Sequence, residues 1–470
     1  MELRLKDIIN VLIIGVFLGT GFMVINGTNV FHYGHTYDQL SLVAFLILFV
    51  LAVFSFAGLI IYNIVKNGYR PSYIIAGVFG LLFIGGMIAI LILNKDKTYH
   101  VNLAEEIREH EYVFTDQIVE FKYPITGIER MRYIFQYLTL LMSTYLIVDI
   151  IPKVLDGRKA VALGSILIIS FALFCVIFSY FKDHERYALI FGDLTKGELF
   201  LHSVSSFFSH KNYFGFLLFL ATISSLYLHQ YKSHFWWIIT AMFFYSHILF
   251  TWDKSSLLIT TVFLVAYFIY RFLFTLRLHK KMNIIGLSAT LGTIVVFVVT
   301  LIIICSVNIV FKDSLIKSFT TRGTTTFASR RAIWKLCTMI FGQTNIIIGA
   351  GYKSFAELIR LFDSYAFMEG GVYSAHNAYL EMLGTGGILL LLAFFAITAY
   401  LIYLSIKYFR AEHGVSMFTM ILITVVFAYM MVESGSFLFS QTLDYGYLSI
   451  ICCVPILSVH QSLRRGISIL

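Results

Sequence analysis

Charged side chains are what this sequence lacks most. Lysine, arginine, aspartate and glutamate make up 13% of its 470 residues, while hydrophobic residues make up 59% and the mean hydropathy is +0.83. Soluble chains carry about 25% charged residues, because their surfaces must face water. This composition excludes a soluble globular protein and indicates a membrane protein.

Cysteine and proline are also scarce, with five and four residues. Only Cys337 lies in an expected loop, and the other cysteines fall in apolar runs: Cys175, Cys305, Cys452 and Cys453. A disulfide framework is therefore not expected. The first apolar run, 8–25, lacks a small-residue cleavage site, so we expect an uncleaved first helix. Without repeats or low-complexity segments, residues 1–470 are expected to form a single membrane domain.

Apolar runs long enough to cross roughly 30 Å of hydrocarbon recur along the chain. They predict an all-α polytopic fold of about twelve transmembrane helices, over 8–25, 40–65, 73–93, 133–151, 160–181, 212–229, 235–250, 255–274, 284–311, 384–406, 415–432 and 443–459. Three long loops separate these helices, at 94–132, 182–211 and 312–377. The last and largest is inserted between helices 9 and 10.

The placement of lysine and arginine predicts the orientation in the membrane. Sixteen of them lie in short segments on the side of the amino terminus, and the short segments on the other side hold only Lys254. We therefore expect both termini in the cytoplasm and all three long loops outside. This asymmetry accounts for the net charge of +9 without nucleic-acid binding.

Ionisable residues are nearly missing from the expected spans, where Asp149 and Glu433 lie close to span ends. Ion-coupled transporters usually keep such residues near the membrane midplane, because they form the transport site. A coupled carrier is therefore disfavoured. A flippase with a hydrated cavity remains an alternative.

The third long loop contains an amphipathic segment, 329–342. Ser329 is expected to cap a helix there and Gly342 to end it. One face would carry apolar residues and the other polar ones, with Arg330 at the border between Ile333, Leu336, Cys337, Ile340 and Phe341 on one side and Arg331, Trp334, Lys335 and Thr338 on the other. A guanidinium fork matches phosphate oxygens, so this helix is a candidate diphosphate platform. A surface helix among lipid headgroups explains the same spacing.

Two further segments follow in the same loop. Gly349 and Gly351 permit a tight turn, but as a phosphate loop they are a weak signal, because no Gly-Lys-Thr ending follows. His376 and Asn377 come just before the helix that re-enters the membrane. A histidine at the interface suits proton transfer near neutral pH, although a lone histidine is more often a structural hydrogen-bonding group.

Taken in order, these motifs resemble the carboxy-terminal pattern of the O-antigen ligase and Wzy-type polymerase superfamily: Arg330-x-x-x-Trp334, Gly349-x-Gly351 and His376-Asn377. Two upstream segments also resemble that family. One is 206–215, which contains His210-Lys211-Asn212, and the other is 250–255, which contains Lys254. The resemblance covers about residues 203–395, and every motif lies on the expected outer face.

The resemblance implies a membrane glycosyltransferase of the C class that inverts the anomeric carbon, with undecaprenyl diphosphate as the leaving group. The implied catalytic residues are Arg330, which stabilises charge on the diphosphate, and His376, which orients or deprotonates the acceptor hydroxyl. No metal or other cofactor is expected. The remaining candidate substrate-binding residues are Arg331, Arg322, Lys211, Asn212, Lys254 and Asn377.

The same resemblance implies a multi-pass protein of the bacterial cytoplasmic membrane. Its expected partners are a polyprenyl diphosphate-linked oligosaccharide, a sugar acceptor and the bilayer, with chain-length regulator and flippase proteins as further candidates. The His-Lys-Asn form of 210–212 favours a polymerase of capsule or exopolysaccharide over a ligase.

The sequence departs from the family pattern at two positions. Ser203 stands where many members have an arginine, and Asp253 stands where a serine is common. His202, His210 or Lys211 are candidates to supply the missing contact.

A metal-dependent glycosyltransferase is a further alternative, with Glu109-His110-Glu111 as the source of ligands. The neighbouring Glu105, Glu106 and Arg108 favour a solvated helix face there instead.

Overall fold

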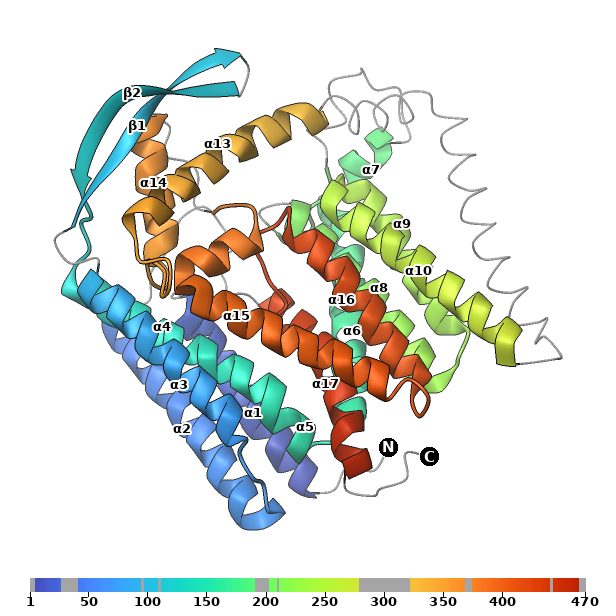
Figure 1. The fold of residues 1–470 in the computed structure, drawn as a ribbon. Helices are drawn as coiled ribbons and strands as arrows, with labels where there is room; N and C mark the ends of the chain where they lie inside the picture. The colour runs from blue at the N-terminus through green and yellow to red at the C-terminus, as the bar shows by residue number, and fades with distance from the viewer. Residues whose placement is uncertain are drawn as a thin grey trace.

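The computed structural model of the chain describes residues 5–26, 41–93, 97–108, 111–190, 203–208, 211–278, 322–367, 374–439 and 443–464. Figure 1 shows a bundle of long helices with a smaller layer of strands and helices at one end. Within the described ranges, ten helices are long and apolar enough to cross a membrane. The predicted all-α polytopic fold is confirmed.

Eleven of the twelve predicted spans have a counterpart among the described helices. These are α1 (Leu5–Asn26), α2 (Leu42–Asn67), α3 (Tyr73–Ile88), α4 (Gly127–Tyr145) with its continuation α5 (Ile151–Val154), α6 (Gly157–Lys182), α8 (Lys211–Lys232), α9 (Trp236–Thr251), α10 (Lys254–Leu278), α15 (Ala378–Lys407), α16 (His413–Met430) and α17 (Leu443–Arg464). Of these, α9 is shorter than a full span. The twelfth, 284–311, lies outside the described residues.

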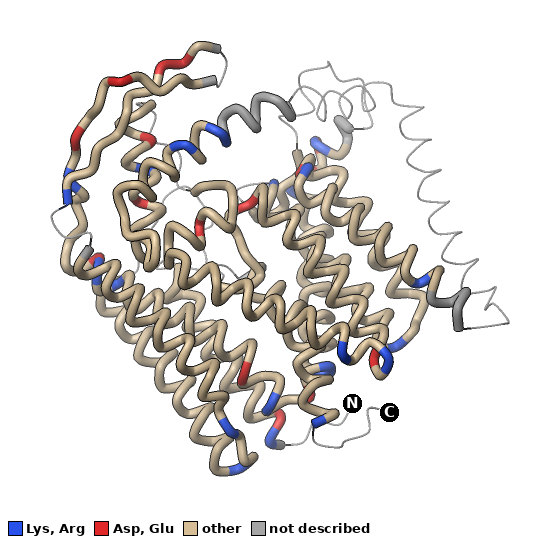
Figure 2. The backbone as a smooth tube through the Cα atoms, viewed as in Figure 1, with Lys and Arg blue, Asp and Glu red and all other residues tan. Residues whose placement is uncertain are grey.

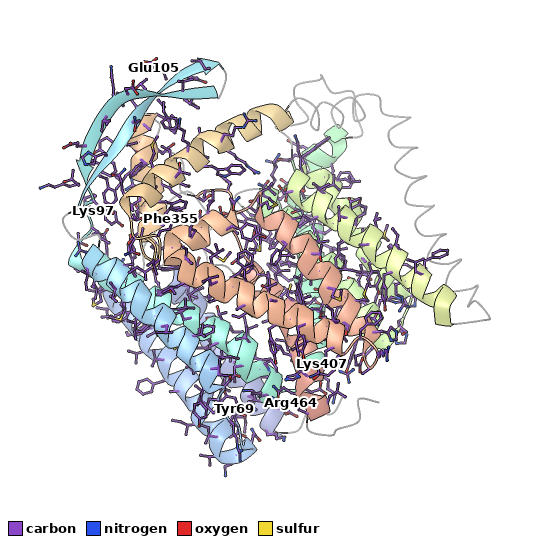
Figure 3. All side chains as sticks on the ribbon, in the orientation of Figure 1. Tyr69, Lys97, Glu105, Phe355, Lys407 and Arg464 are labelled. Carbon is purple, nitrogen blue, oxygen red and sulfur yellow. The ribbon has the colours of Figure 1, made fainter. Side chains whose placement is uncertain are left out.

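Charged residues gather at both ends of the bundle and are scarce along the middle of its helices (Figure 2). The start of α1 and the end of α17 lie together at one of these ends (Figure 1). Figure 3 places Tyr69, Lys407 and Arg464 at this end, and Lys97, Glu105 and Phe355 at the opposite end. The two ends therefore correspond to the two faces that the charge count separated, while the predicted orientation itself remains a prediction.

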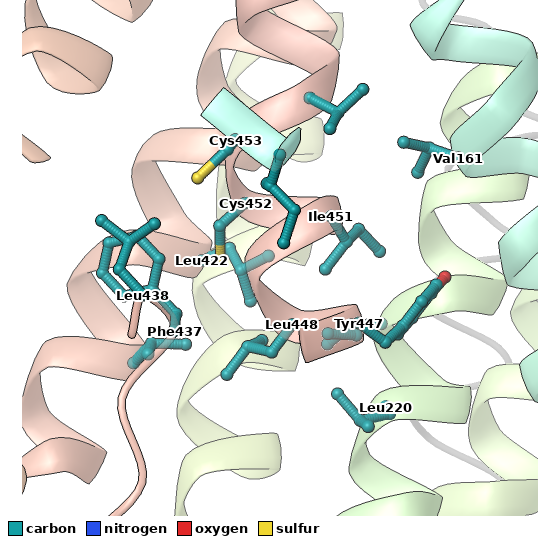
Figure 4. Close-up of a cluster of buried hydrophobic side chains, with 14 of the residues drawn as sticks. Val161, Leu220, Leu422, Phe437, Leu438, Tyr447, Leu448, Ile451, Cys452 and Cys453 are labelled. Atoms are coloured by element: carbon teal, nitrogen blue, oxygen red, sulfur yellow. The ribbon is translucent and has the colours of Figure 1, made fainter. Parts of the chain in front are cut away.

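The buried interior of the bundle is built around α8. Its residues from Phe214 to His229 are all buried, whereas side chains such as Phe54 and Ile74 are 71% and 83% exposed on the outer helices. Apolar exposure of this kind suits contact with lipid. Figure 4 shows α17 residues around Tyr447 and Cys452 in this interior. The Tyr447 hydroxyl forms hydrogen bonds with Ser165 and Ser224, each at 2.9 Å, and so links α17 to α6 and α8.

The first and third long loops fold together into a second core. Strands β1 (Thr98–Arg108) and β2 (Glu111–Lys122) pack with α13 (Arg322–Gln343) and α14 (Ser354–Ala366), and we call these four elements the cap layer. Tyr99 and Phe121 meet Phe362 in this core at ring-centre distances of 6.0 and 5.3 Å. The cap layer covers the end of the bundle opposite the chain termini (Figure 1).

The interpretation of Glu105, Glu106 and Arg108 as part of a helix face is wrong. They lie in β1, which pairs with β2 in an antiparallel hairpin, with Tyr99 opposite Phe121 and Val101 opposite Val119. Tyr99 and Val101 are buried while His100 between them is exposed, which is the alternation of a strand with one covered face. Packing of this covered face against α14 favours the strand conformation, and the charged residues further along the hairpin continue the strand.

Two expectations for the third loop also need correction. Helix α13 begins at Arg322, so Ser329 lies inside the helix and is not its N-cap. Cys337 is fully buried in the cap-layer core and does not lie in an open loop. The four described cysteines are all free thiols, as the sequence predicts.

A further short helix at this end of the molecule, α7 (His184–Ile190), follows α6. Most of the remaining second loop, 191–202, lies outside the described residues.

Candidate active site

The predicted site residues lie where the cap layer meets the bundle. Helices α8, α10 and α15 begin at this end and α16 finishes there, so their termini face α13. Arg330 comes from α13, His376 and Asn377 immediately precede α15, and Lys211 and Lys254 open α8 and α10. Four separate segments therefore supply the candidate residues.

The two faces of α13 follow the predicted pattern with one exception. Ile333, Leu336 and Ile340 are buried, whereas Arg331 and Lys335 are exposed and Arg330 is half-buried. Trp334 was expected on the polar face, but it is half-buried and its indole Nε1 donates a hydrogen bond to the Ala375 carbonyl oxygen at 2.9 Å. Arg330 and Trp334 lie one turn apart, so this bond brings Arg330 beside the segment that carries His376.

The backbone around His376 is held from several sides. His376 has a φ of 47°, in the left-handed region that few non-glycine residues adopt. The amide of Ala375 donates to Glu381 Oε1 at 2.6 Å, and its carbonyl accepts from Trp334. Such a conformation persists only where its surroundings impose it. The His376 segment is thus fixed by α13 and α15 together.

Asn377 performs the capping role at the start of α15. Its Oδ1 accepts hydrogen bonds from the amides of Tyr379 and Leu380, at 3.0 and 3.2 Å. Its Nδ2 donates to the Met431 carbonyl at 3.3 Å, which ties α15 to the segment after α16. These contacts satisfy backbone donors at the helix start, and a substrate contact by Asn377 remains a prediction.

A lysine and a glutamate link the cap layer to α15 below His376. Burial lowers the pKa of Lys353 to about 8, while the nearby carboxylates of Glu381 and Glu357 oppose this shift. Lys353 opens α14 with a φ of 61°. Attraction between Lys353 and Glu381 therefore helps to hold α14 against the helix that follows His376.

Arg330 influences the charge of two neighbouring groups. The pKa of His376 is lowered, first by burial and then by repulsion from the Arg330 guanidinium. Burial also raises the pKa of Glu433 to about 7, with a further rise from Asp253, whereas Arg330 and the Ser255 hydroxyl oppose it. At neutral pH His376 is therefore a neutral imidazole, which is the form that accepts a proton.

Asp253 is a second buried carboxyl at this site. It is 3% exposed, and burial raises its pKa to about 6 although Lys211 and nearby serine groups oppose the rise. Its Oδ1 accepts a hydrogen bond from the Ser255 amide at 3.1 Å. A methyl group on Gly215 would lie 2.7 Å from its Oδ2, so glycine at this position of α8 makes room for the carboxyl.

The structure thus brings most of the predicted residues to one region. Arg330 acts on both His376 and Glu433, Lys211 acts on Asp253, and the two carboxyl groups act on one another. Arg331 is exposed on the next position of α13. The side chain of Arg322 lies outside what the structure describes. Lys254 and Asn212 are half-buried at the starts of their helices.

Sequence reasoning did not assign the two carboxyl groups to the site. Glu433 had been noted as an ionisable residue at a span end, and Asp253 as a departure from the family pattern. Each was a signal, but only the fold shows that the start of α10 and the end of α16 meet.

The Gly349–Gly351 turn serves the fold and does not form a phosphate loop. Gly349 and Gly351 have φ values of +73° and +95°. The amides of Ala350 and Gly351 donate to the carbonyls of Gly384 and Thr385, at 2.7 and 3.1 Å, and the Gly349 amide donates to Asn345 at 2.7 Å. Because carbonyls already occupy these amides, they are not free to bind an anion. The turn instead docks into the interruption of α15.

The departure at Ser203 also has a structural context. Arg186 of α7 donates a hydrogen bond to the Ser203 carbonyl at 2.5 Å and pairs with Asp183 at 3.3 Å. Asp183 Oδ2 accepts from the amides of Ser205 and Ser206 at 3.3 and 3.0 Å. An arginine thus lies beside position 203, but it comes from another segment. His202 and His210, the other candidates, lie outside the described residues.

The metal-dependent alternative is not supported by the described ranges. No three histidine, cysteine, aspartate or glutamate side chains there are grouped as a metal site requires. Glu109 and His110 lie outside these ranges, and so does the side chain of Glu111.

A comparison with protein families decides the assignment. Residues 240–395, from α9 to the first half of α15, match the family described as O-antigen ligase. This stretch is similar to the O-antigen ligase family, and we call it the O-antigen ligase domain. The domain includes Lys254, Arg330, His376 and Asn377, so the resemblance drawn from these motifs is confirmed, whereas Lys211 and Asn212 precede the matched range. No curated protein matches the chain.

The O-antigen ligase domain supports a multi-pass membrane glycosyltransferase of the ligase or polymerase type. It also implies a lipid-linked oligosaccharide as substrate.

Proposed function

We propose that the protein is an inverting, metal-independent glycosyltransferase that polymerises capsule or exopolysaccharide repeat units. It takes the oligosaccharide from an undecaprenyl diphosphate-linked donor at the outer face of the bacterial cytoplasmic membrane. The observation that carries this proposal is the half-buried Arg330 beside the neutral His376 within the O-antigen ligase domain.

The two residues have complementary tasks in this reaction. The acceptor hydroxyl oxygen forms a bond to the anomeric carbon, and the bond from that carbon to the diphosphate oxygen breaks. Negative charge then grows on the diphosphate, where Arg330 stabilises it, with Arg331, Arg322, Lys211 and Lys254 as further cations. His376 takes the proton of the acceptor hydroxyl, which its neutral state allows.

The location at the end of the helices suits this substrate. A polyprenyl chain can remain in the bilayer beside the apolar helices while the diphosphate reaches their polar ends. The cap layer covers that end and supplies Arg330 (Figure 1). Asn212 and Asn377 are proposed to contact the donor or to hold the segments that do.

A ligase is the alternative within the same chemistry. It would use the same donor and the same clamp, but would transfer the glycan to a different lipid or to a cell-wall acceptor. A flippase for lipid-linked sugars is the alternative outside it, and would move the donor without forming a glycosidic bond.

One reconstitution experiment separates these three functions. Purified protein in liposomes is supplied with its lipid-linked repeat unit, and the products are resolved on a gel. A ladder of increasing length supports a polymerase. A single product that appears only with a second acceptor supports a ligase, and transport without any new glycosidic bond would contradict the proposed function. Activity should also survive a strong chelator.

A further inference from the structure

The site contains two carboxyl groups that the proposed reaction does not use. Glu433 follows α16, and Asp253 lies in the turn before α10. Carboxylates repel a diphosphate, so the presence of two carboxyl groups beside Arg330 and Lys211 needs an explanation.

Glu433 is positioned by contacts on both sides. Ser255 Oγ donates a hydrogen bond to Glu433 Oε1 at 3.2 Å, and the Glu433 amide donates to the Tyr429 carbonyl at 3.1 Å. Two residues earlier, the Met431 carbonyl accepts from Asn377. The carboxyl is therefore held next to the His376 segment by α10, α16 and the cap of α15.

Asp253 lies behind Glu433 and is more deeply buried. The Ser255 amide bonds its Oδ1, while its Oδ2 has no hydrogen-bond partner within the part of the chain that the structure describes. The two carboxyls repel one another, which contributes to the raised pKa of Glu433. Two like charges in one buried site rarely both remain ionised.

Each carboxyl also has a cationic neighbour. Arg330 acts on Glu433 and Lys211 acts on Asp253. Several elements contribute groups around Glu433. The nearest are Asp253 in the turn before α10, Ser255 of α10, Arg330 of α13 and Tyr429 of α16. Tyr445 of α17 lies beside Tyr429, and Lys211 of α8 lies beside Asp253. The carboxyls thus balance the half-buried cations, which would otherwise be costly to hold out of water.

We propose that Glu433, supported by Asp253, is the resident counter-ion of Arg330, and that diphosphate binding displaces it and adds one proton to this carboxyl pair. The diphosphate oxygens then take over the guanidinium, and the proton comes from water. The inference rests on the proposed function, because it takes the ligand to be a diphosphate.

The direction of the effect follows from electrostatics. A bound diphosphate places new negative charge near Glu433 and removes the attraction of Arg330, and both changes favour the protonated carboxyl. Binding and protonation are reciprocal, so a lower pH must strengthen diphosphate binding. Burial raises the pKa of Glu433 to about 7. The affinity for the diphosphate should therefore depend on pH above pH 7, where it can change by at most about tenfold for each pH unit.

The test uses the full-length purified protein and a short-chain P1,P2-dialkyl diphosphate as the probe. Both phosphates of this probe are diesters that do not titrate near neutral pH, so any proton exchange belongs to the protein. Calorimetric titration at pH 8 in two buffers with different ionisation enthalpies gives the number of protons taken up. We expect uptake approaching one proton, and affinity that rises several-fold as the pH falls from 8.5 to 7.

Two site variants and one control assign the proton. Glu433→Gln should abolish the uptake, flatten the pH dependence and bind the probe several-fold more tightly than the wild type at pH 8.5. His376→Gln should retain the uptake, which excludes the imidazole as its source. Glu412→Gln, which alters a glutamate paired with Arg158 at 2.9 Å near the opposite end, should behave as the wild type.

The outcomes are distinguishable. Binding without proton uptake by the wild type would overturn this inference and leave the diphosphate site intact, even if Glu433→Gln fails to fold. Uptake that is lost in His376→Gln and retained in Glu433→Gln would also overturn it. If the probe does not bind at all, the diphosphate site of the proposed function fails, and this inference fails with it.

Discussion

The indole of Trp334 donates a hydrogen bond to the carbonyl oxygen of Ala375, and this contact joins α13 to the segment that carries His376. It gives a physical reason for the Arg330-x-x-x-Trp334 spacing, because residues four apart lie on neighbouring turns of one helix face. Trp334 anchors the helix, and Arg330 is then placed beside the imidazole.

Trp334→Phe should weaken catalysis by loosening this junction. The change keeps an aromatic ring but removes the N–H donor, at a cost of about 1 kcal/mol for one neutral hydrogen bond. We expect transfer to fall about fivefold, with membrane insertion intact. Steady-state transfer and thermal unfolding on the same preparation measure both effects. An unchanged rate would show that the Ala375 contact does not position His376.

Arg330→Ala should reduce transfer about ten- to a hundredfold, because one charge-assisted contact is worth about 1.5–3 kcal/mol. Arg330→Lys should rescue poorly, since an ammonium group cannot reproduce the bidentate fork. The control is Arg360→Ala on α14, where the arginine pairs with Glu357 at 2.9 Å within the cap layer. Normal transfer by Arg330→Ala would contradict the platform, and Arg331 or Arg322 would be tested next.

The predicted orientation can be tested by labelling. The cysteines that the structure describes are all buried, so an introduced exposed thiol should dominate the signal. Glu120→Cys on β2 should react with an impermeant maleimide added outside intact cells. Arg410→Cys, exposed near the opposite end, should react only after permeabilisation. The reverse pattern would place the cap layer in the cytoplasm and remove the proposed site from the outer face.

Gly387→Ala should destabilise the protein strongly. Gly387 has a φ of +65°, and a Cβ there would lie 2.2 Å from the Ile347 carbonyl oxygen. Strain of this type costs about 1–3 kcal/mol before the clash is counted. We expect a lower unfolding temperature in detergent. The control is Gly19→Ala in α1, where no side chain or neighbouring element of the described residues lies within 4 Å of the added Cβ, and it should show no loss.

The sequence predicted the spans well because length and apolarity are sufficient to define them. It did not predict the hairpin, because the inward alternation of Tyr99 and Val101 is short and a run of charged residues follows it. Arg330, His376 and Asn377 were found from their order along the chain. The contribution of Glu433 was not, because its neighbours Ser255 and Arg330 come from distant segments that only tertiary packing brings together.

The role of His376 can be separated from that of the diphosphate clamp. If His376 accepts the proton of the acceptor hydroxyl, His376→Ala should lower turnover by about 10²–10⁴-fold while donor affinity changes little. If it only positions the loop, donor binding or the unfolding temperature should fall instead. The left-handed φ of 47° makes the second measurement necessary, because any substitution there can alter the local backbone.

The pH dependence gives the decisive check on His376. The active form of a general base is the neutral imidazole, so kcat/KM should fall on the acid side, where the imidazole becomes protonated. Burial and Arg330 both lower the pKa of His376, so in the free enzyme this fall should be centred below the ordinary value of 6.5. Arg330→Gln removes one of the two causes and should move the midpoint upward, whatever its effect on the absolute rate. A His376→Gln variant that retains most of its turnover would rule out proton transfer, since glutamine can hydrogen-bond but cannot act as a base at neutral pH. A midpoint that ignores the charge at position 330 would instead assign the acid limb to another group, and it would exclude Glu433 too, because Arg330 also lowers the pKa of that carboxyl.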